Sequence, residues 1–261
     1  MPEKKRFIVL GAGAIGSVFG AFLAGGGHDV TLIGRKPHLD AIERDGLRIE
    51  GLWGDRRVCG FTLVTDAGGI GGGRDCDFAL VTVKSYATRK ILEEYGGKIF
   101  PEKAIVLLQN GIGGLETAAG FFPEEKTAGG RVIFGAETTA PGRVRVTVEA
   151  DSVVVGWNRR GAPPGVLDEL AATLTECGIT TRVTDDIHRF LWEKALYNCA
   201  LNPLSAVLGM SYGELAACAH TRAIMDGVIG EMFAVMDASG VKVSFGSARE
   251  YMNELLERLI P

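Results

Sequence analysis

Residues 6–36, RFIVLGAGAIGSVFGAFLAGGGHDVTLIGRK, decide the fold class. The stretch opens with the apolar run RFIVL, passes through a glycine-rich turn into a helical pattern that ends in glycines, and closes with a second apolar run, DVTLI. A strand, a crossover helix and a parallel strand together need about thirty residues, which is the length found here. The stretch therefore predicts a right-handed βαβ unit.

The turn inside this unit carries a GxGxxG pattern. Alone it is a weak signal, because the chain contains 37 glycines and chance matches are common. Its place between a strand and a helix makes it informative: Gly11 permits a tight turn, Gly13 lets backbone approach a pyrophosphate, and Gly16 allows close helix packing. We expect the whole loop to bind a dinucleotide: Gly11, Ala12, Gly13, Ala14, Ile15 and Gly16.

The end of the second apolar run indicates which dinucleotide is bound. NAD-binding proteins tend to carry an acidic residue there for the ribose hydroxyls, whereas this chain reads IGRK. Arg35 and Lys36 offer cations to a 2′-phosphate, and Arg35 directly follows the strand, so the pattern favours NADP(H) with Arg35 as its phosphate contact. The alternative is that both are solvated surface cations.

Two more polar residues end apolar runs. VTVKS places Lys84 at the carboxyl end of one predicted strand, and LLQNG places Asn110 at the end of another. Ligands of open parallel sheets lie outside these ends, so we expect Lys84 and Asn110 to join the glycine loop and Arg35 in one cleft. The alternatives are a strand-end lysine with its ammonium in solvent and an asparagine that only forms a turn.

The rest of the chain predicts an α/β fold, with a Rossmann-type doubly wound parallel sheet followed by a smaller all-helical domain. Strands are expected at 6–10, 29–33, 77–83 and 104–109, and later runs at 131–135, 143–148 and 152–156 suggest antiparallel strands that finish the sheet. A helix is expected over 164–177. We expect residues 1–184 to form the NADP-binding domain and residues 185–261 the helical domain.

Composition excludes several function classes. A net charge of −4 and a pI near 5.7 argue against a nucleic acid partner. Five dispersed cysteines without metal-site spacing suit a reducing cytoplasm, with no disulfide and no metal site. The uncharged run from Phe7 to Gly27 contains too many glycines for a signal or membrane segment. A homodimer is the assembly to test, since the sequence does not fix the oligomeric state.

A second informative stretch is LWEKALYNCALNPLSA at 191–206. Lys194, Asn198 and Asn202 recur every fourth position, so they share one face of a helix. Their neighbours are largely apolar, which predicts a helix mostly enclosed by protein, whose polar face needs a partner. Pro203 predicts that the helix bends or ends there and turns Asn202 toward the cleft.

Together these motifs resemble the ketopantoate reductase family. The resemblance runs from Phe7 to the end of the chain and rests on GAGAIG, the strand-end Lys84, QNGIG around Asn110 and the WEKxxxNxxxNPL pattern from Trp192 to Leu204. The last pattern is the specific one. The family implies a Rossmann domain and a helical domain with the substrate between them, and NADPH-dependent reduction of ketopantoate to pantoate in pantothenate and coenzyme A biosynthesis.

The resemblance also assigns roles. It implies that Lys194 is the catalytic lysine, that Asn198 and Asn202 bind substrate, that Lys84 and Asn110 line the cofactor and substrate cleft, and that Arg35 contacts the 2′-phosphate. These assignments suit the chemistry, because hydride transfer to a ketone leaves an alkoxide that an ammonium can stabilise and protonate.

One departure and two alternatives remain. The family implies further helices beyond residue 261 with an Asn or Ser and a Glu at the substrate site, so the helical domain is expected to be incomplete. One alternative function is the reduction of another branched 2-oxo acid. The other is a noncatalytic NADP(H)-binding sensor, which would have little need to retain Lys194 and its asparagines.

Overall fold

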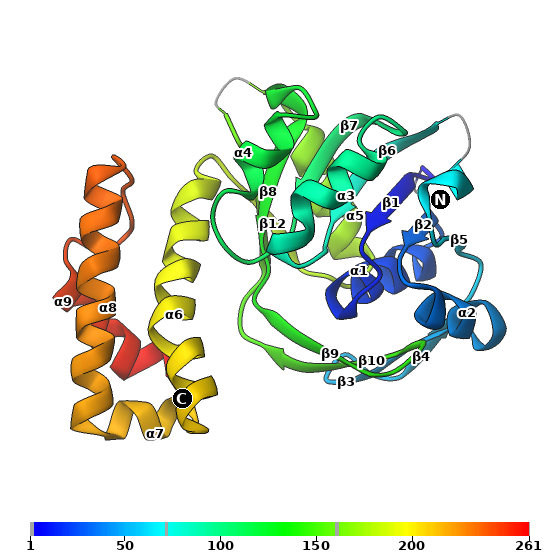
Figure 1. Ribbon diagram of the computed structural model, residues 1–261. Coiled ribbons are helices and arrows are strands. Elements are labelled where there is room, and N and C mark those ends of the chain that lie inside the picture. Colours follow the sequence, from blue (N-terminus) through cyan, green and yellow to red (C-terminus); the bar gives the residue numbers. More distant parts are fainter. Residues whose placement is uncertain (1–2, 71–72, 160–161, 261) are drawn as a thin grey trace. The chain divides into compact units, whose positions relative to one another are not determined.

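The computed structural model describes residues 3–70, 73–159 and 162–260 (Figure 1). The chain forms two compact units, Met1–Ile187 and His188–Pro261. The boundary expected between residues 184 and 185 lies just before this division. Because each unit has its own hydrophobic core, each can be described by itself.

The first unit is built on a sheet with the strand order β12-β11-β8-β7-β6-β1-β2-β5 (Figure 1). All neighbours in it are parallel except β11, which runs antiparallel to β8. The strands are β1 Arg6–Leu10, β2 Asp29–Ile33, β5 Thr62–Val64, β6 Arg74–Val81, β7 Ile99–Leu107, β8 Thr127–Arg131, β11 Val153–Trp157 and β12 Thr181–Thr184. Strand β1 has β2 on one side and β6 on the other, so the strand order reverses beside it, confirming the doubly wound fold.

Helices cover both faces of this sheet. Helices α1 (Ala14–Gly25) and α5 (Val166–Glu176) share one core with it. On the other face lie α3 (Thr88–Tyr95) and α4 (Gly114–Ala119), as Figure 1 shows. Strand β8 illustrates the alternation: Ala128 belongs to the first core, whereas Gly129 lies against Leu115 of α4. Helix α2 (Lys36–Asp45) lies beside β5.

A second sheet contradicts the expectation that all later strands finish the main one. It has the order β4-β3-β10-β9 and comprises β3 Leu47–Gly51, β4 Arg56–Val58, β9 Phe134–Ala140 and β10 Arg143–Glu149. The run RVRVTV therefore lies in the second sheet as β10, and RVIFG straddles β8 and β9, where the chain leaves the main sheet. Only SVVVG lies where expected, in β11.

The second sheet covers a side of α1 that the main sheet does not reach. Residues Gly16–Leu23 of α1 are buried, which requires cover on both faces of the helix. Phe19 packs against Phe134 of β9 and Phe22 against Trp53, with ring centroids 5.7 and 5.3 Å apart. Helix α1 is thus held between two sheets (Figure 1).

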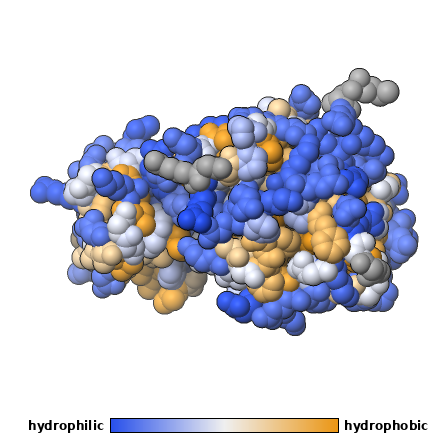
Figure 2. Space-filling view, turned by 90° about the horizontal axis from the view of Figure 1, so that it is seen from above, coloured by the Kyte–Doolittle hydropathy of each residue, from blue (hydrophilic) through white to orange (hydrophobic). Residues whose placement is uncertain are grey.

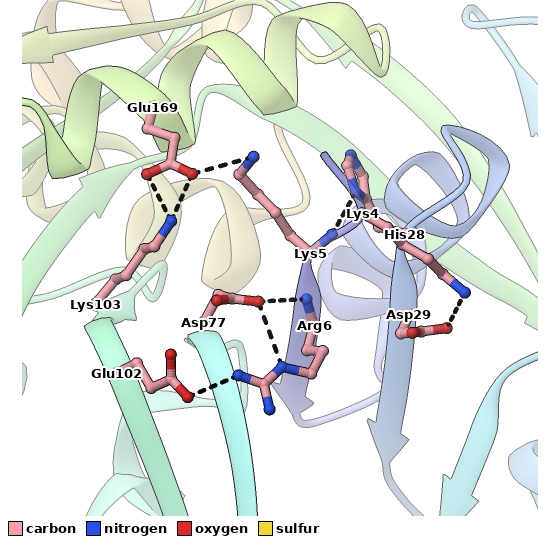
Figure 3. Close-up of polar contacts among 9 residues, drawn as sticks. All are labelled: Lys4, Lys5, Arg6, His28, Asp29, Asp77, Glu102, Lys103 and Glu169. Atoms are coloured by element: carbon pink, nitrogen blue, oxygen red, sulfur yellow. Dashed lines mark hydrogen bonds and ion pairs between the residues drawn. The ribbon is translucent and has the colours of Figure 1, made fainter. Parts of the chain in front are cut away.

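Charged residues at the amino ends of the central strands pair with one another (Figure 3). Glu169 of α5 accepts hydrogen bonds from Lys103, at 2.6 and 2.7 Å, and lies 3.1 Å from the ammonium of Lys5, which is 8% exposed. Arg6 contacts Asp77 through its backbone N–H and Glu102 through its guanidinium. We call this group of side chains the amino edge.

The second unit is helical. It contains most of α6 (Ile187–Leu208), together with α7 (Tyr212–Ala217), α8 (Ala219–Ala238) and α9 (Ala248–Glu254), which runs into a π-helical turn at Leu255–Leu259. Its core joins Leu196, Ala200 and Leu201 of α6 to Met225 and Ile229 of α8, among others. Helix α6 continues past Pro203 to Leu208, so of the two outcomes expected at Pro203 the end of the helix is excluded and a bend stays a prediction.

The surface carries both hydrophilic and hydrophobic residues. Figure 2 shows a face on which hydrophilic residues predominate and hydrophobic patches lie between them, as on many water-exposed proteins. Across the described residues, the longest apolar helix falls short of what crossing a membrane requires.

Candidate active site

The glycine loop joins β1 to α1 and is fastened to the neighbouring strand. The N–H groups of Gly11 and Ala12 both donate to the carbonyl oxygen of Ile33, at 3.0 and 2.7 Å. Gly11 has a φ of +116°, a left-handed conformation that side chains disfavour. The loop is therefore held at the carboxyl ends of β1 and β2.

The other two glycines of the pattern differ sharply in their surroundings. A methyl group at Gly16 would lie 2.2 Å from the Gly11 carbonyl oxygen and 2.5 Å from Oγ1 of Thr82. A methyl group at Gly13 would meet nothing within 4 Å. Gly16 thus allows the helix to pack closely, and Gly13 faces open space into which a ligand can come against the backbone.

Helix α1 begins at this open space. Its N-cap is Gly13, and no side chain caps it. The amide groups of Ala14, Ile15 and Gly16 precede the first intrahelical hydrogen bond, which Ser17 donates to Gly13. Three N–H donors and the positive end of the helix dipole at an uncrowded glycine suit a pyrophosphate, so the loop fits a dinucleotide.

Thr82 supports the loop from the adjacent strand. Its hydroxyl donates to the carbonyl oxygens of Gly11, at 2.8 Å, and of Leu10, at 3.3 Å. The apolar run at 77–83 predicted a strand that includes Thr82. In fact β6 ends at Val81, and the signal that could have found Thr82 is a hydroxyl just past an apolar strand.

Arg35 lies beside the glycine loop. Gly34 packs so closely on Ala12 that a methyl group at Gly34 would lie 2.8 Å from the Ala12 side chain. Arg35 follows as the N-cap of α2, and its exposed side chain makes no hydrogen bond or ion pair in the part of the chain that the structure describes. Lys36 instead pairs with Asp40 at 3.1 Å. Of the two cations, Lys36 therefore has an ion-pair partner among the described residues and Arg35 has none.

His38 links Arg35's helix to its surroundings and had no sequence signal. Its Nδ1 accepts the N–H of Gly142 at 3.1 Å, and its Nε2 lies 3.0 Å from the Ser17 hydroxyl. With Nδ1 as an acceptor, the neutral ring carries its proton on Nε2. Burial, and then the positive charge of Arg35, lower the pKa of His38.

Lys84 and Asn110 occupy the loops after β6 and β7. Both are exposed, and their side chains make no hydrogen bond or ion pair to residues that the structure describes. Gln109 ties the two loops together, because its Nε2 donates to the carbonyl oxygen of Val83 at 2.9 Å and to Oγ1 of Thr88 at 2.7 Å. The role of Gln109 was not predicted from the QNGIG motif, in which it precedes Asn110.

The structure thus brings four predicted positions to one edge of the sheet. The glycine loop, Arg35, Lys84 and Asn110 follow β1, β2, β6 and β7, which are neighbours in the order β7-β6-β1-β2. We call this group the carboxyl edge. Ligands of such sheets bind outside the point where the strand order reverses, here between β1 and β6.

Lys194, Asn198 and Asn202 lie on α6 in the second unit. Lys194 and Asn198 are half-buried and Asn202 is exposed, so protein encloses the first part of the predicted stretch and leaves its later part open. Buried residues lie on several sides of the helix, among them the neighbours Ala195 and Leu196, and within the polar stripe the exposure is highest at Asn202. That the stripe faces the carboxyl edge stays a prediction.

Two asparagines of the stripe bond to each other. The Nδ2 of Asn202 donates to Oδ1 of Asn198 at 3.2 Å, and the hydroxyl of Tyr212 lies 2.5 Å from Oδ1 of Asn202. The two asparagines of the stripe therefore have each other and Tyr212 of α7 as hydrogen-bond partners.

Comparison with known proteins identifies the family. Residues 7–159 match the family described as Ketopantoate reductase PanE/ApbA, and residues 186–259 match its C-terminal domain. The 2-dehydropantoate 2-reductases of Aquifex aeolicus and Pyrococcus horikoshii are 37% and 33% identical to the chain. They align with 98% and 97% of it, and each alignment spans 80% of the relative.

Solved structures agree. A ketopantoate reductase from Ralstonia eutropha and a 2-dehydropantoate 2-reductase from Geobacter metallireducens are each 30% identical to the chain, with TM-scores of 0.84 and 0.85. Each alignment covers 97% of this chain and 80% or 81% of the other. A D-mandelate dehydrogenase complex with NADH, at 23% identity and a TM-score of 0.86, shares the fold. The chain belongs to the ketopantoate reductase family of oxidoreductases.

Proposed function

We propose that the protein reduces the 2-keto group of ketopantoate to give pantoate, with NADPH as the electron donor. The observation that carries the proposal is the stripe of Lys194, Asn198 and Asn202 on one face of α6. A structural helix gains little from keeping an ammonium and two amides in line on one face. A reductase of a small anionic ketone needs such donors for the substrate's oxygens.

The carboxyl edge supports the choice of cofactor. The amides at the start of α1 would hold the pyrophosphate, and Arg35 would hold the 2′-phosphate in a charge-assisted contact. Lys84 and Asn110 would line the nicotinamide end, since they follow β6 and β7 beside the reversal point. Bound there, the reduced nicotinamide supplies the hydride.

Lys194 would act as the acid. Hydride addition to the ketone carbon turns the carbonyl oxygen into an alkoxide, and the Lys194 ammonium would stabilise that charge and donate a proton to the same oxygen. Asn198 and Asn202 would orient the substrate through its hydroxyl and carboxylate. Neutral amides do this without adding a charge beside the reacting carbon.

An NADPH-oxidation assay over a panel of branched 2-oxo acids tests the proposal. We expect the highest kcat/KM with ketopantoate. Higher kcat/KM with another member of the panel would instead support the alternative substrate, and NADPH binding without any turnover would support the sensor.

Lys194→Ala should lower kcat by about 100-fold or more with little change in NADPH affinity, and near-normal kcat would remove its role as the acid.

Cofactor choice has its own test. Arg35→Ala should raise the KM for NADPH by about 10-fold to 100-fold and leave that for NADH almost unchanged, because only NADPH carries the 2′-phosphate. Lys36→Ala is the matched control, since Lys36 pairs with Asp40. Equal losses for the two cofactors would refute the phosphate contact.

The proposal includes a small-molecule substrate, a cytoplasmic location and a homodimer as the assembly to test. Light scattering coupled to size-exclusion chromatography measures the assembly directly. A monomer mass would exclude the homodimer and leave the reaction unaffected.

A further inference from the structure

We propose that Tyr212 is a positioning residue for the substrate: it sets the direction of the Asn202 and Asn198 amides so that the pair offers N–H donors to the ligand. The proposal rests on the proposed function, because it assumes that this stripe binds the 2-oxo acid. The residues concerned all lie in the second unit, on α6 and α7.

The hydrogen bonds form a relay with one direction. The Tyr212 hydroxyl donates to Oδ1 of Asn202 at 2.5 Å, which leaves the Asn202 Nδ2 to donate to Oδ1 of Asn198 at 3.2 Å. An asparagine amide has an acceptor end and a donor end of nearly the same shape, so only its partners fix which end points where. Here the partner at the start of the relay is a hydroxyl.

The relay ends on a donor. Because Oδ1 of Asn198 already accepts from Asn202, the donors that Asn198 offers beyond the relay are the two N–H groups of its Nδ2. Lys194 lies one helical turn earlier on the same face and adds an ammonium. Donors at both positions suit the oxygens of a carboxylate or a ketone, and they disfavour ligands that present their own donors there.

The local structure holds Tyr212 in place. Its ring packs edge-on against Tyr197 of α6, with centroids 5.8 Å apart and an interplanar angle of 85°. Ser211 and Glu214 form a capping box that fixes the first turn of α7, and the Ser205 hydroxyl donates to the Met210 carbonyl oxygen at 2.7 Å. The turn between α6 and α7 is thus fastened at both ends, so the hydroxyl of Tyr212 has a defined position.

The experiment is steady-state kinetics of Tyr212→Phe with ketopantoate. The variant keeps the ring that packs on Tyr197 and removes only the hydroxyl, so the amides lose their fixed direction. We expect the KM for ketopantoate to rise about 10-fold, kcat to fall less, and the KM for NADPH to stay the same. A merely structural role would lower the melting temperature without this split.

Two comparisons sharpen the result. Tyr197→Phe is the matched control, because the Tyr197 hydroxyl has no hydrogen bond among the described residues, and it should leave both KM values unchanged. Adding Tyr212→Phe to Asn202→Ala should raise the KM for ketopantoate no further, since the relay is already broken. In a ¹⁵N-resolved NMR spectrum, Tyr212→Phe should also shift the side-chain amide signals of Asn198 and Asn202.

Separate outcomes overturn the inference and the function on which it rests. An unchanged KM for ketopantoate in Tyr212→Phe, together with a raised KM in Asn198→Ala, would overturn the role of Tyr212 alone. An unchanged KM in both variants, or no reduction of ketopantoate by the wild-type protein, would overturn the substrate role of the stripe and the inference with it.

Discussion

The two edges of the main sheet both carry cationic side chains, but these are paired with carboxylates at the amino edge and not at the carboxyl edge. At the amino edge, Lys5 and Lys103 pair with Glu169, and Arg6 pairs with Asp77 and Glu102 (Figure 3). At the carboxyl edge, the side chains of Arg35, Lys84 and Asn110 have neither a hydrogen bond nor an ion pair with any residue that the structure describes.

This difference in pairing indicates that the amino edge contributes to folding and that the carboxyl edge is suited to binding a ligand. An unpaired buried charge costs several kcal/mol, so Lys5, which is buried, and Lys103, which is half-buried, need protein partners. Exposed cations at the carboxyl edge are solvated in the free protein, so they can exchange water for a phosphate. A histidine lies beside each edge: His28, whose Nδ1 accepts the backbone N–H of Lys5, is buried, and His38, on the helix that Arg35 begins, is half-buried.

The largest effect is expected from the glycine loop, where one substitution should affect cofactor binding alone and another should affect both binding and stability. Gly13→Ala puts a methyl group into open space, so stability should be kept while NADPH affinity falls about 100-fold through obstruction of the pyrophosphate. Gly16→Ala should lose the same affinity and also about 2–3 kcal/mol of unfolding free energy, because its methyl group overlaps the Gly11 carbonyl oxygen. NADPH fluorescence titration and urea unfolding measure the two quantities. A Gly13→Ala protein that binds NADPH normally would contradict the assignment.

The next effect belongs to the amino edge and should appear in stability alone. Glu169→Gln leaves Lys5 and Lys103 without their carboxylate, and Lys5 is 8% exposed, so the unfolding free energy should fall by about 2 kcal/mol. The KM for NADPH should not change. Lys4→Ala is the control, because Lys4 and Asp29 form an exposed pair whose loss should cost less than about 0.5 kcal/mol. A raised KM for NADPH in Glu169→Gln would show that the two edges are coupled.

The smallest effect is a pH dependence that both edges share. Burial, and then Lys5, lower the pKa of His28, and burial, and then Arg35, lower that of His38. The unfolded chain therefore binds more protons below about pH 6.5, so this stability is complete above that pH and is lost as the pH falls through the lower folded-state pKa. His38→Gln should lose less stability between pH 7 and pH 5 than the wild type, as judged by urea midpoints. An identical loss in both proteins would mean that His38 contributes none of it.

Local sequence patterns predicted much of the fold. Strands β1 and β2 have the bounds that the apolar runs at 6–10 and 29–33 predicted, because strand, turn and helix signals follow one another without a gap. The second sheet was missed, since the alternation in RVRVTV shows that one face is buried and does not show which sheet it joins. That choice depends on α1, more than a hundred residues earlier in the chain.

The residues of the candidate site also fall into two groups, those that local sequence predicts and those that depend on contacts distant in sequence. Strand-end positions such as Lys84 and Asn110 follow from the order of the chain, whereas Thr82, Gln109 and His38 act through contacts with residues distant in sequence. The exposure of Asn202 was not predicted, because apolar neighbours in sequence do not reveal how far along a helix the cover extends. Tyr212 was missed for a related reason: its hydroxyl reaches Asn202 across the turn between two helices.

The confinement of α1 between two sheets has a thermodynamic consequence for the ligand. The N–H groups at the start of this helix are already fixed in the free protein, so the loop is preorganised and little conformational entropy is lost when a pyrophosphate arrives. Cofactor association should then show the small heat-capacity change of a rigid, polar contact rather than that of a segment that folds on binding.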